Sequence, residues 1–146
     1  MGRLNMVADN LKSIVNNLTQ QGDMYFCEGT EESQITAFEE LHDIKLPDKY
    51  REWLRFSDGG ELFLPAGVQL YGVDHKPVIN VNDDDRPDDN YIVIGALASG
   101  DPVIFRKTEQ IISIYNHDAG RIEDDESYDD FFCFLNDLYD ALGIGD

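Results

Sequence analysis

The sequence predicts an α+β fold, in which a twisted antiparallel sheet of about six short strands packs against N-terminal helices and a C-terminal helix. Apolar residues recur at helical spacing in the first 60 residues and again after residue 130. Between these regions lie short segments rich in β-branched and aromatic residues, separated by Gly, Pro, Asp and Asn. Their close spacing leaves no room for crossover helices, so neighbouring strands are expected to run antiparallel.

Length and composition indicate one domain. The 146 residues fall in the common single-domain range, and a 42% hydrophobic share is enough for one core. We therefore expect residues 1–146 to form a single domain, of which residues 1–21 are an N-terminal helix.

Two amphipathic helices are expected first. The first ends where Gly22 offers a stop, and its apolar stripe is Leu4, Val7, Leu11, Ile14, Val15 and Leu18. In the second, Thr30 is the expected N-cap, and the acids that follow it suit the positive end of a helix. The stripe of this second helix is Ile35, Phe38 and Leu41.

A very short third helix lies in the stretch IKLPDKYREWLRFSDGG. Pro47 suits its first turn, because the missing N–H has no partner at that position. The apolar face of this helix is Tyr50, Trp53 and Leu54. This spacing places Trp53 in the core rather than at an interface. Gly59 and Gly60 permit the left-handed backbone that ends a helix and reverses the chain.

The strand-like segments and a last helix complete the fold. The segments are residues 61–64, 68–73, 77–80, 90–97, 102–107 and 111–117. Ser127 and Asp130 resemble a capping box at the start of the helix, and Gly143 ends it. The stripe of the helix is Phe131, Leu135, Leu138, Tyr139 and Leu142. Phe131, Phe132 and Phe134 are not expected all to face inward, which leaves one of them for an interface.

The charge balance restricts the class of partner. Thirty Asp and Glu against 11 Lys and Arg give a formal net charge of −19 and a pI of about 4.2. A field of this sign repels nucleic acids and anionic membranes and attracts cations and basic proteins. We therefore expect no nucleic-acid or membrane partner.

The cysteines and the absence of apolar targeting segments in the sequence are the features that predict the cellular location. Cys27 and Cys133 form no metal pattern and lie among apolar residues, so they are expected to be buried free thiols, although a disulfide stays open. The sequence shows no apolar signal-peptide core and no run of membrane-spanning length. A cytoplasmic location is expected.

The stretch ITAFEELHDIKLPDKYREWLRFSDGG resembles the N-terminal signature of the SUKH superfamily. The matching positions are Ile35, Phe38, Glu39, Leu46, Pro47, Tyr50, Trp53, Leu54, Asp58, Gly59 and Gly60. The segments YIVIGALASGDPVIFRK, IYNHDAG and SYDDFFCFLNDLY resemble later parts of the same family in the same order, so that the likeness spans residues 30–142.

This resemblance implies an α+β fold in which the Leu-Pro helix and the Gly-Gly turn are scaffold. It also implies a role in protein binding. Many bacterial members of the superfamily are immunity proteins that neutralise a toxin domain, often a nuclease, and a fungal branch regulates cell-wall synthesis. No catalytic motif belongs to the family, so the resemblance supplies no active site.

Two acidic segments are the candidate partner-binding residues. Residues 83–89 have a net charge of −4 and residues 123–130 a net charge of −6, which together supply −10 of the total −19. The candidates are Asp83, Asp84, Asp85, Asp88, Asp89, Glu123, Asp124, Asp125 and Glu126. A concentrated acidic surface steers a cationic partner to its site. The alternative is a solvated loop and a helix start whose acids match the dipole.

Metal, cofactor and catalytic sites are not indicated. The segment at 83–89 lacks the turn glycine and the closing Glu of a calcium loop. His42, His75 and His117 are scattered, and an adjacent Asp does not make a catalytic triad.

The leading hypothesis is a non-enzymatic immunity protein of SUKH type whose acidic surface covers the basic groove of a toxin. The alternatives are a regulatory or scaffolding module without a toxin partner, and a hydrolase with a pocket around one histidine. The sequence leaves the partner's identity and the oligomeric state open.

Overall fold

The computed structural model describes residues 2–64, 67–73, 90–107, 109–116 and 118–141, with the backbone alone for 2–10, 123–126 and 139–141. The described helices are α1 (Gly2–Gln21), α2 (Glu32–His42), α3 (Asp48–Phe56) and α4 (Phe131–Ala141). The described strands are β1 (Asp23–Tyr25), β2 (Gly60–Leu64), β3 (Val68–Leu70), β4 (Tyr91–Leu97), β5 (Pro102–Arg106), β6 (Ile112–Asn116) and β7 (Arg121–Tyr128). This order confirms the predicted α+β fold, with N-terminal helices and a C-terminal helix.

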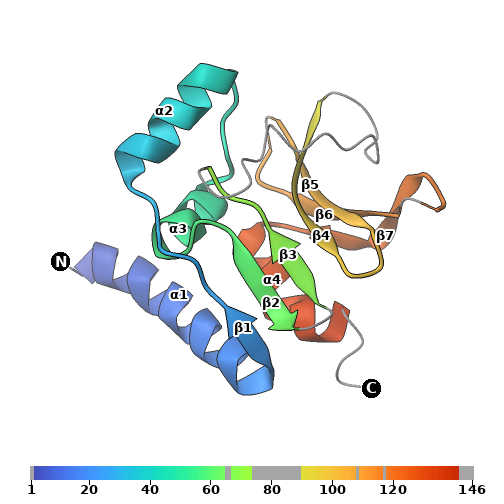
Figure 1. Ribbon diagram of the computed structural model, residues 1–146, viewed down its shortest axis with the longest axis horizontal. Coiled ribbons are helices and arrows are strands. Elements are labelled where there is room, and N and C mark those ends of the chain that lie inside the picture. Colours follow the sequence, from blue (N-terminus) through green and yellow to red (C-terminus); the bar gives the residue numbers. More distant parts are fainter. Residues whose placement is uncertain (1, 65–66, 74–89, 108, 117, 142–146) are drawn as a thin grey trace.

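The seven strands form one sheet whose order in space is their order in the chain (Figure 1). Every neighbouring pair is antiparallel, as the short connections predict. Strands β1 and β7 were not predicted, because β1 is only three residues long and β7 contains four consecutive acids in place of alternating apolar residues. The strand predicted at residues 77–80 lies outside the described residues.

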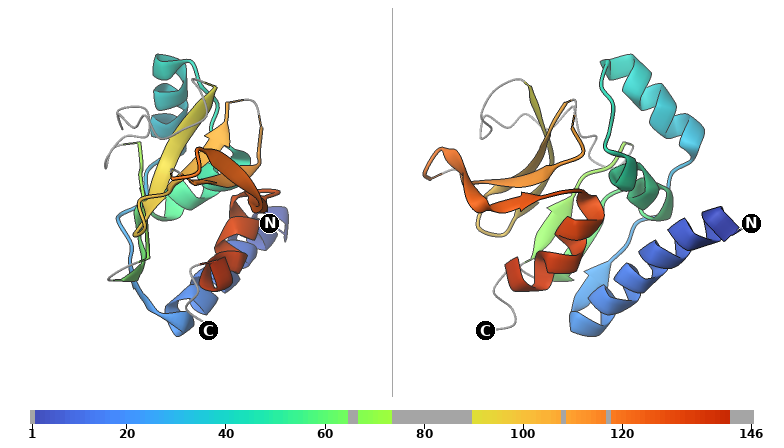
Figure 2. Two further views of the ribbon diagram at one scale, coloured as in Figure 1. Left: turned by 90° about the vertical axis from the view of Figure 1, so that its right-hand side faces the viewer. Right: turned by 180° about the vertical axis from the view of Figure 1, so that it is seen from behind.

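One hydrophobic core joins the sheet to all four helices. Helix α1 lies alongside α4 (Figure 2), and α3 contacts both α2 and α4. The core includes Ile14 and Leu18 from α1, which confirms these two positions of the apolar stripe predicted for the first helix. Gly22 follows the helix, and its N–H donates to the Leu18 carbonyl at 3.1 Å.

Helix α2 differs from the prediction at its start and on its surface. Glu31, not Thr30, is the N-cap, and it forms a capping box with Gln34. The Thr30 hydroxyl instead donates to Gln34 Oε1 at 2.7 Å. Leu41 is 79% exposed, so its place in the predicted stripe is wrong. The helix ends at His42, and its C-cap, Asp43, has a left-handed φ of 54°.

Helix α4 also starts differently from the prediction. Ser127 belongs to β7, and Asp130 caps the helix by accepting a hydrogen bond from the Cys133 N–H at 2.9 Å. The prediction that one aromatic residue of FFCF is exposed is wrong, because Phe131, Phe132 and Phe134 are all buried. The ammonium group of Lys49 lies over the Phe132 ring, 5.2 Å from its centroid.

Candidate partner-binding surface

Ten of the eleven positions that carry the family resemblance lie inside the molecule, and Glu39 is half-buried. The buried positions are Ile35, Phe38, Leu46, Pro47, Tyr50, Trp53, Leu54, Asp58, Gly59 and Gly60. Trp53 packs edge-on against Phe131 of α4 and against Phe56, with ring centroids 5.9 and 5.4 Å apart. These residues therefore hold the fold together and offer no surface to a partner, as the sequence predicts for a scaffold.

The turn after α3 is closed by hydrogen bonds to one carbonyl group. Trp53 Nε1 and Ser57 Oγ both donate to the Gly59 carbonyl oxygen, at 2.9 and 2.8 Å. Ser57 Oγ in turn accepts from the Cys27 N–H at 2.9 Å, which ties the segment after β1 to the turn. Gly59 and Gly60 have φ values of 95° and 123°, which only glycine adopts without strain.

Asp58 connects this turn to the segment after β3. Its Oδ1 accepts from the Val73 N–H at 2.8 Å, and its own N–H donates to the Glu28 carbonyl at 3.1 Å. Gly72 allows this approach, since a Cβ at that position would lie 2.2 Å from Asp58 Oδ1. The nearby Tyr50 hydroxyl donates to the Tyr71 carbonyl. Burial, and secondly the Asp58 charge, raise the pKa of Tyr50 well above its ordinary value.

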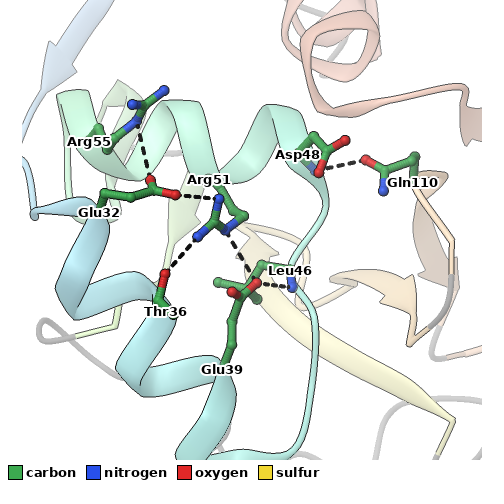
Figure 3. Close-up of polar contacts among 8 residues, drawn as sticks. All are labelled: Glu32, Thr36, Glu39, Leu46, Asp48, Arg51, Arg55 and Gln110. Atoms are coloured by element: carbon green, nitrogen blue, oxygen red, sulfur yellow. Dashed lines mark hydrogen bonds and ion pairs between the residues drawn. The ribbon is translucent and has the colours of Figure 1, made fainter.

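A charged cluster between α2 and α3 also has a structural role (Figure 3). Arg51 lies 2.7 Å from a Glu32 carboxylate oxygen, and its Nη2 donates to Thr36 Oγ1 at 3.2 Å. Arg51 Nε is 3.3 Å from Glu39 Oε2 but is not aligned for a hydrogen bond, so this contact is Coulombic. Glu39 Oε2 accepts from the Leu46 N–H at 2.7 Å, which fixes the loop that leads into α3.

The two predicted acidic segments have different outcomes. Asp83, Asp84, Asp85, Asp88 and Asp89 lie outside the described residues. Residues Glu123, Asp124, Asp125 and Glu126 occupy the middle of β7, the last strand in the order of the described sheet, whereas the alternative considered from sequence for this segment was a helix start. The remaining acids of the second segment, Asp129 and Asp130, lie where α4 begins. The acidic segment thus divides into a strand part and a helix-capping part.

A polar hollow of about 380 Å³ was not predicted from sequence. Its lining residues are Glu28, Gly29, Thr30, Glu31, Gln34 and Asp58. The three acids do not form a run in the sequence, and the hydrogen bond between the Asp58 N–H and Glu28 helps to bring them together. The hollow adds negative surface beside the α2 N-terminus.

One of the three histidines lies in the part of the chain that the structure describes. His42 packs its ring on Phe38, with centroids 4.5 Å apart, while His75 and His117 lie outside the described residues. Within the part of the chain that the structure describes, no three His, Cys, Asp or Glu side chains gather as metal ligands do.

Cys27 and Cys133 are free thiols, so the disulfide left open by the sequence is not formed. The expectation that both are buried is wrong: Cys27 is half-buried, and Cys133 is exposed because its position on α4 faces solvent while its neighbours face the core. Burial, followed by the charge of Asp58, raises the pKa of Cys27. Burial, followed by Asp130, raises the pKa of Cys133.

Comparison with known families agrees with this arrangement. The family model described as SMI1 / KNR4 family (SUKH-1) matches residues 29–137, which include every buried signature residue and strands β2 to β7. The chain belongs to the SMI1/KNR4 (SUKH-1) family. Helix α1 precedes the matched region of this SUKH-1 protein. No curated protein matches the chain at a significant level. Among the described helices of the SUKH-1 chain, none is both long and apolar enough to cross a membrane.

Proposed function

We propose that this SUKH-1 protein is a non-enzymatic, cytoplasmic binding protein, a bacterial immunity protein that neutralises a cognate basic toxin such as a nuclease. Its acidic surface covers the groove in which the toxin binds its own substrate. The partner-binding residues in this proposal are Asp83, Asp84, Asp85, Asp88, Asp89, Glu123, Asp124, Asp125 and Glu126.

One observation carries the proposal. Nearly all signature residues of the family are buried in the scaffold, whereas four consecutive acids, Glu123 to Glu126, lie on the last strand of the sheet among the described residues. Carboxylates that are close together repel one another, and a cationic partner relieves that repulsion. A groove that binds a polyanionic substrate through Lys and Arg is such a partner.

The mechanism is competition for the basic groove. Clustered carboxylates steer a cationic toxin into contact and raise its association rate, and this effect falls as salt screens the charges. Once bound, the immunity protein excludes the toxin's substrate by occupying the same cationic side chains. This mechanism needs no cofactor and no catalytic step.

The test starts from the product of an adjacent toxin-like gene, co-expressed and co-purified with this chain. Affinity is then measured at low and at physiological ionic strength for the variant Glu123→Gln/Asp124→Asn. We expect a loss of roughly tenfold or more at low salt and a shallower salt dependence. The matched control is Asp23→Asn/Glu40→Gln, which removes the same two charges from exposed positions on β1 and α2.

A second arm, Asp84→Asn/Asp85→Asn, measures the contribution of the first acidic segment. Unchanged affinity and salt dependence in both pairs would refute the electrostatic mechanism. A regulatory or scaffolding module would give no toxin partner and no salt-sensitive complex.

A further inference from the structure

One row of side chains crosses the face of the sheet that lies opposite the helices. The strand register places four residues directly opposite one another across β1 to β4, and these are Tyr25, Glu61, Gln69 and Ala96. Directly opposed residues share a face. Helix α4 lies behind β2 and β3 in Figure 1 and in front of them in the rear view of Figure 2, so the row lies on the face away from α4. Tyr25 is 55% exposed, and the other three residues are half-buried.

A hollow of about 180 Å³ opens on the same face. Leu64 and Ala98 belong to its apolar wall, and Glu61 and Gln69 line it as well. The Ala98 N–H donates to the Gly67 carbonyl at 2.8 Å, which ties the segment after β4 to the start of β3. A cavity of about 150 Å³ is large enough to take up benzene. The hollow therefore has room for one large side chain.

The position of Leu64 in this wall depends on a strained backbone. Phe63 has a φ of 58°, which is rare for a bulky residue, and its side chain is buried. Because Leu62 and Phe63 both belong to the core, the alternation of the strand is broken and Leu64 is 36% exposed beside the hollow. Gly22 makes room for Phe63, since a Cβ there would lie 2.8 Å from the ring. Backbone strain of this kind is frequent at binding sites.

The polar groups of the hollow are not used within the described chain. Glu61 and Gln69 face each other across β2 and β3, but neither side chain forms a hydrogen bond or an ion pair with another described residue. Glu32 and Glu39 of the charged cluster, by contrast, are both paired with Arg51. A half-buried carboxylate without a cation is stabilised when a cationic group binds beside it.

The combination of groups selects an arginine side chain. A guanidinium group is planar, presents its N–H donors as a fork and stacks on aromatic rings. Glu61 and Gln69 can both accept from this fork, and Tyr25 lies next to Glu61 in the row. The apolar stem of the arginine suits the wall at Leu64. A second copy of this chain is a poorer occupant, because the net charge of −19 opposes the approach of two copies.

We propose that the hollow on the open face of β2 and β3 binds an arginine side chain of a protein partner. Glu61 supplies the charge, Gln69 a second acceptor, and Tyr25 a ring for stacking. The proposal goes beyond the proposed function, because it requires neither a toxin nor the acids of β7.

The probe is the capped tripeptide Ac-Gly-Arg-Gly-NH₂, compared with the same peptide containing citrulline, which has a similar shape and no charge. Titration of the ¹⁵N-labelled full chain should give saturable NMR shifts at residues 61–64, 67–70 and 96–98. We expect the arginine peptide to bind at least about tenfold more tightly than the citrulline peptide, because citrulline forms no charge-assisted pair. A lysine peptide should bind more weakly than the arginine peptide, because an ammonium group lacks the fork of donors.

Two substitutions locate the binding, each with a matched control. Glu61→Gln should lower the affinity for the arginine peptide to that for the citrulline peptide. Glu109→Gln makes the same change at a half-buried position that does not line the hollow, and it should leave the affinity unchanged. Ala98→Leu should fill the hollow from an exposed position and lower the affinity by roughly tenfold. Its control is Ala37→Leu at an exposed position on α2, which should have no effect.

The proposal is overturned if the arginine and citrulline peptides bind equally, or if no saturable shifts occur at the residues of the hollow. Equal losses in Glu61→Gln and Glu109→Gln would show general attraction to an acidic protein instead of a site. If free L-arginine binds about tenfold more tightly than the capped tripeptide, the occupant is a free amino acid and not a protein side chain. Dimerisation of the free chain that Ala98→Leu abolishes would assign the face to a second copy. These titrations use no toxin, so their failure leaves the proposed function standing.

Discussion

The turn after α3 and strand β7 differ in where their polar groups find partners. In the turn, the side chains of Trp53, Ser57 and Asp58 form hydrogen bonds within the chain, and all three residues are buried. In β7, the residues paired in register with β6 lie at the two ends of the strand, and the four acids lie between them where the register shifts. The polar side chains of the first region are thus held within the chain, whereas the second region carries a run of like charges.

This difference explains why the family signature identifies the fold and not the partner. Its residues are those that a short helix and a tight turn need in order to pack against α4 and the sheet. They identify the fold, and they are inaccessible to a partner. In the proposed function the choice of partner depends on β7, so substitutions in the two regions should separate stability from binding.

The largest expected effect is that of Trp53→Ala. Removing a fully buried indole that packs against Phe131 should lower the free energy of unfolding by about 3–5 kcal/mol. Urea unfolding followed by circular dichroism measures this loss. Trp53→Phe keeps an aromatic ring but loses the hydrogen bond to Gly59, so its free energy of unfolding should lie between those of the original protein and Trp53→Ala. The pair Glu123→Gln/Asp124→Asn in β7 is expected to change stability by no more than about 0.5 kcal/mol. If the Trp53 substitutions and the Glu123/Asp124 pair lower the free energy of unfolding by similar amounts, the contrast between a structural turn and a binding strand is wrong.

The next effect is a pH dependence located in the same buried region. Burial raises the pKa of Tyr50 in the folded state, so the folded protein keeps the hydroxyl group neutral while the unfolded chain ionises above about pH 10. The free energy of unfolding should therefore fall as the pH rises above about 10. Tyr50→Phe should remove this component, after a loss of about 1 kcal/mol at neutral pH from the missing hydrogen bond.

Tyr25→Phe is the matched control, because it makes the same change at an exposed position on β1. Its unfolding curve, measured with urea from neutral to alkaline pH, should keep the slope of the original protein. If Tyr50→Phe also keeps that slope, the buried hydroxyl group is not its source.

Sequence periodicity predicted the buried part of the molecule better than its edges. The spacing of Tyr50, Trp53 and Leu54 identifies one helix face, and a core interaction follows directly from it. Strand β7 was missed because its acids show no alternation, and only pairing with β6 makes the segment a strand. The exposure of Leu41 and the burial of all three aromatic residues in FFCF depend on how far neighbouring elements extend, which local spacing does not encode.

The smallest expected effect tests the boundary between the two regions. Asp130 belongs to the same acidic segment as Glu123, but its Oδ1 accepts a hydrogen bond from the Cys133 N–H at the start of α4. Asp130→Ala should therefore cost about 1 kcal/mol of stability, while Asp130→Asn, which retains a capping oxygen, should cost less. Urea unfolding again measures both.

The reactivity of the Cys133 thiol is a second, independent measure of the contact between Asp130 and Cys133. Burial and then Asp130 raise its pKa, so the loss of the carboxylate in Asp130→Asn should lower that pKa and increase the thiolate fraction at a given pH. Both proteins carry Cys27→Ala, so that Cys133 is the thiol that reacts. Alkylation of Cys133 by iodoacetamide should be faster in the Asp130→Asn variant. If Asp130→Asn instead weakens partner binding as strongly as Glu123→Gln/Asp124→Asn does, the capping residue belongs to the interface. The division of this acidic segment into a binding strand and a structural cap would then be wrong.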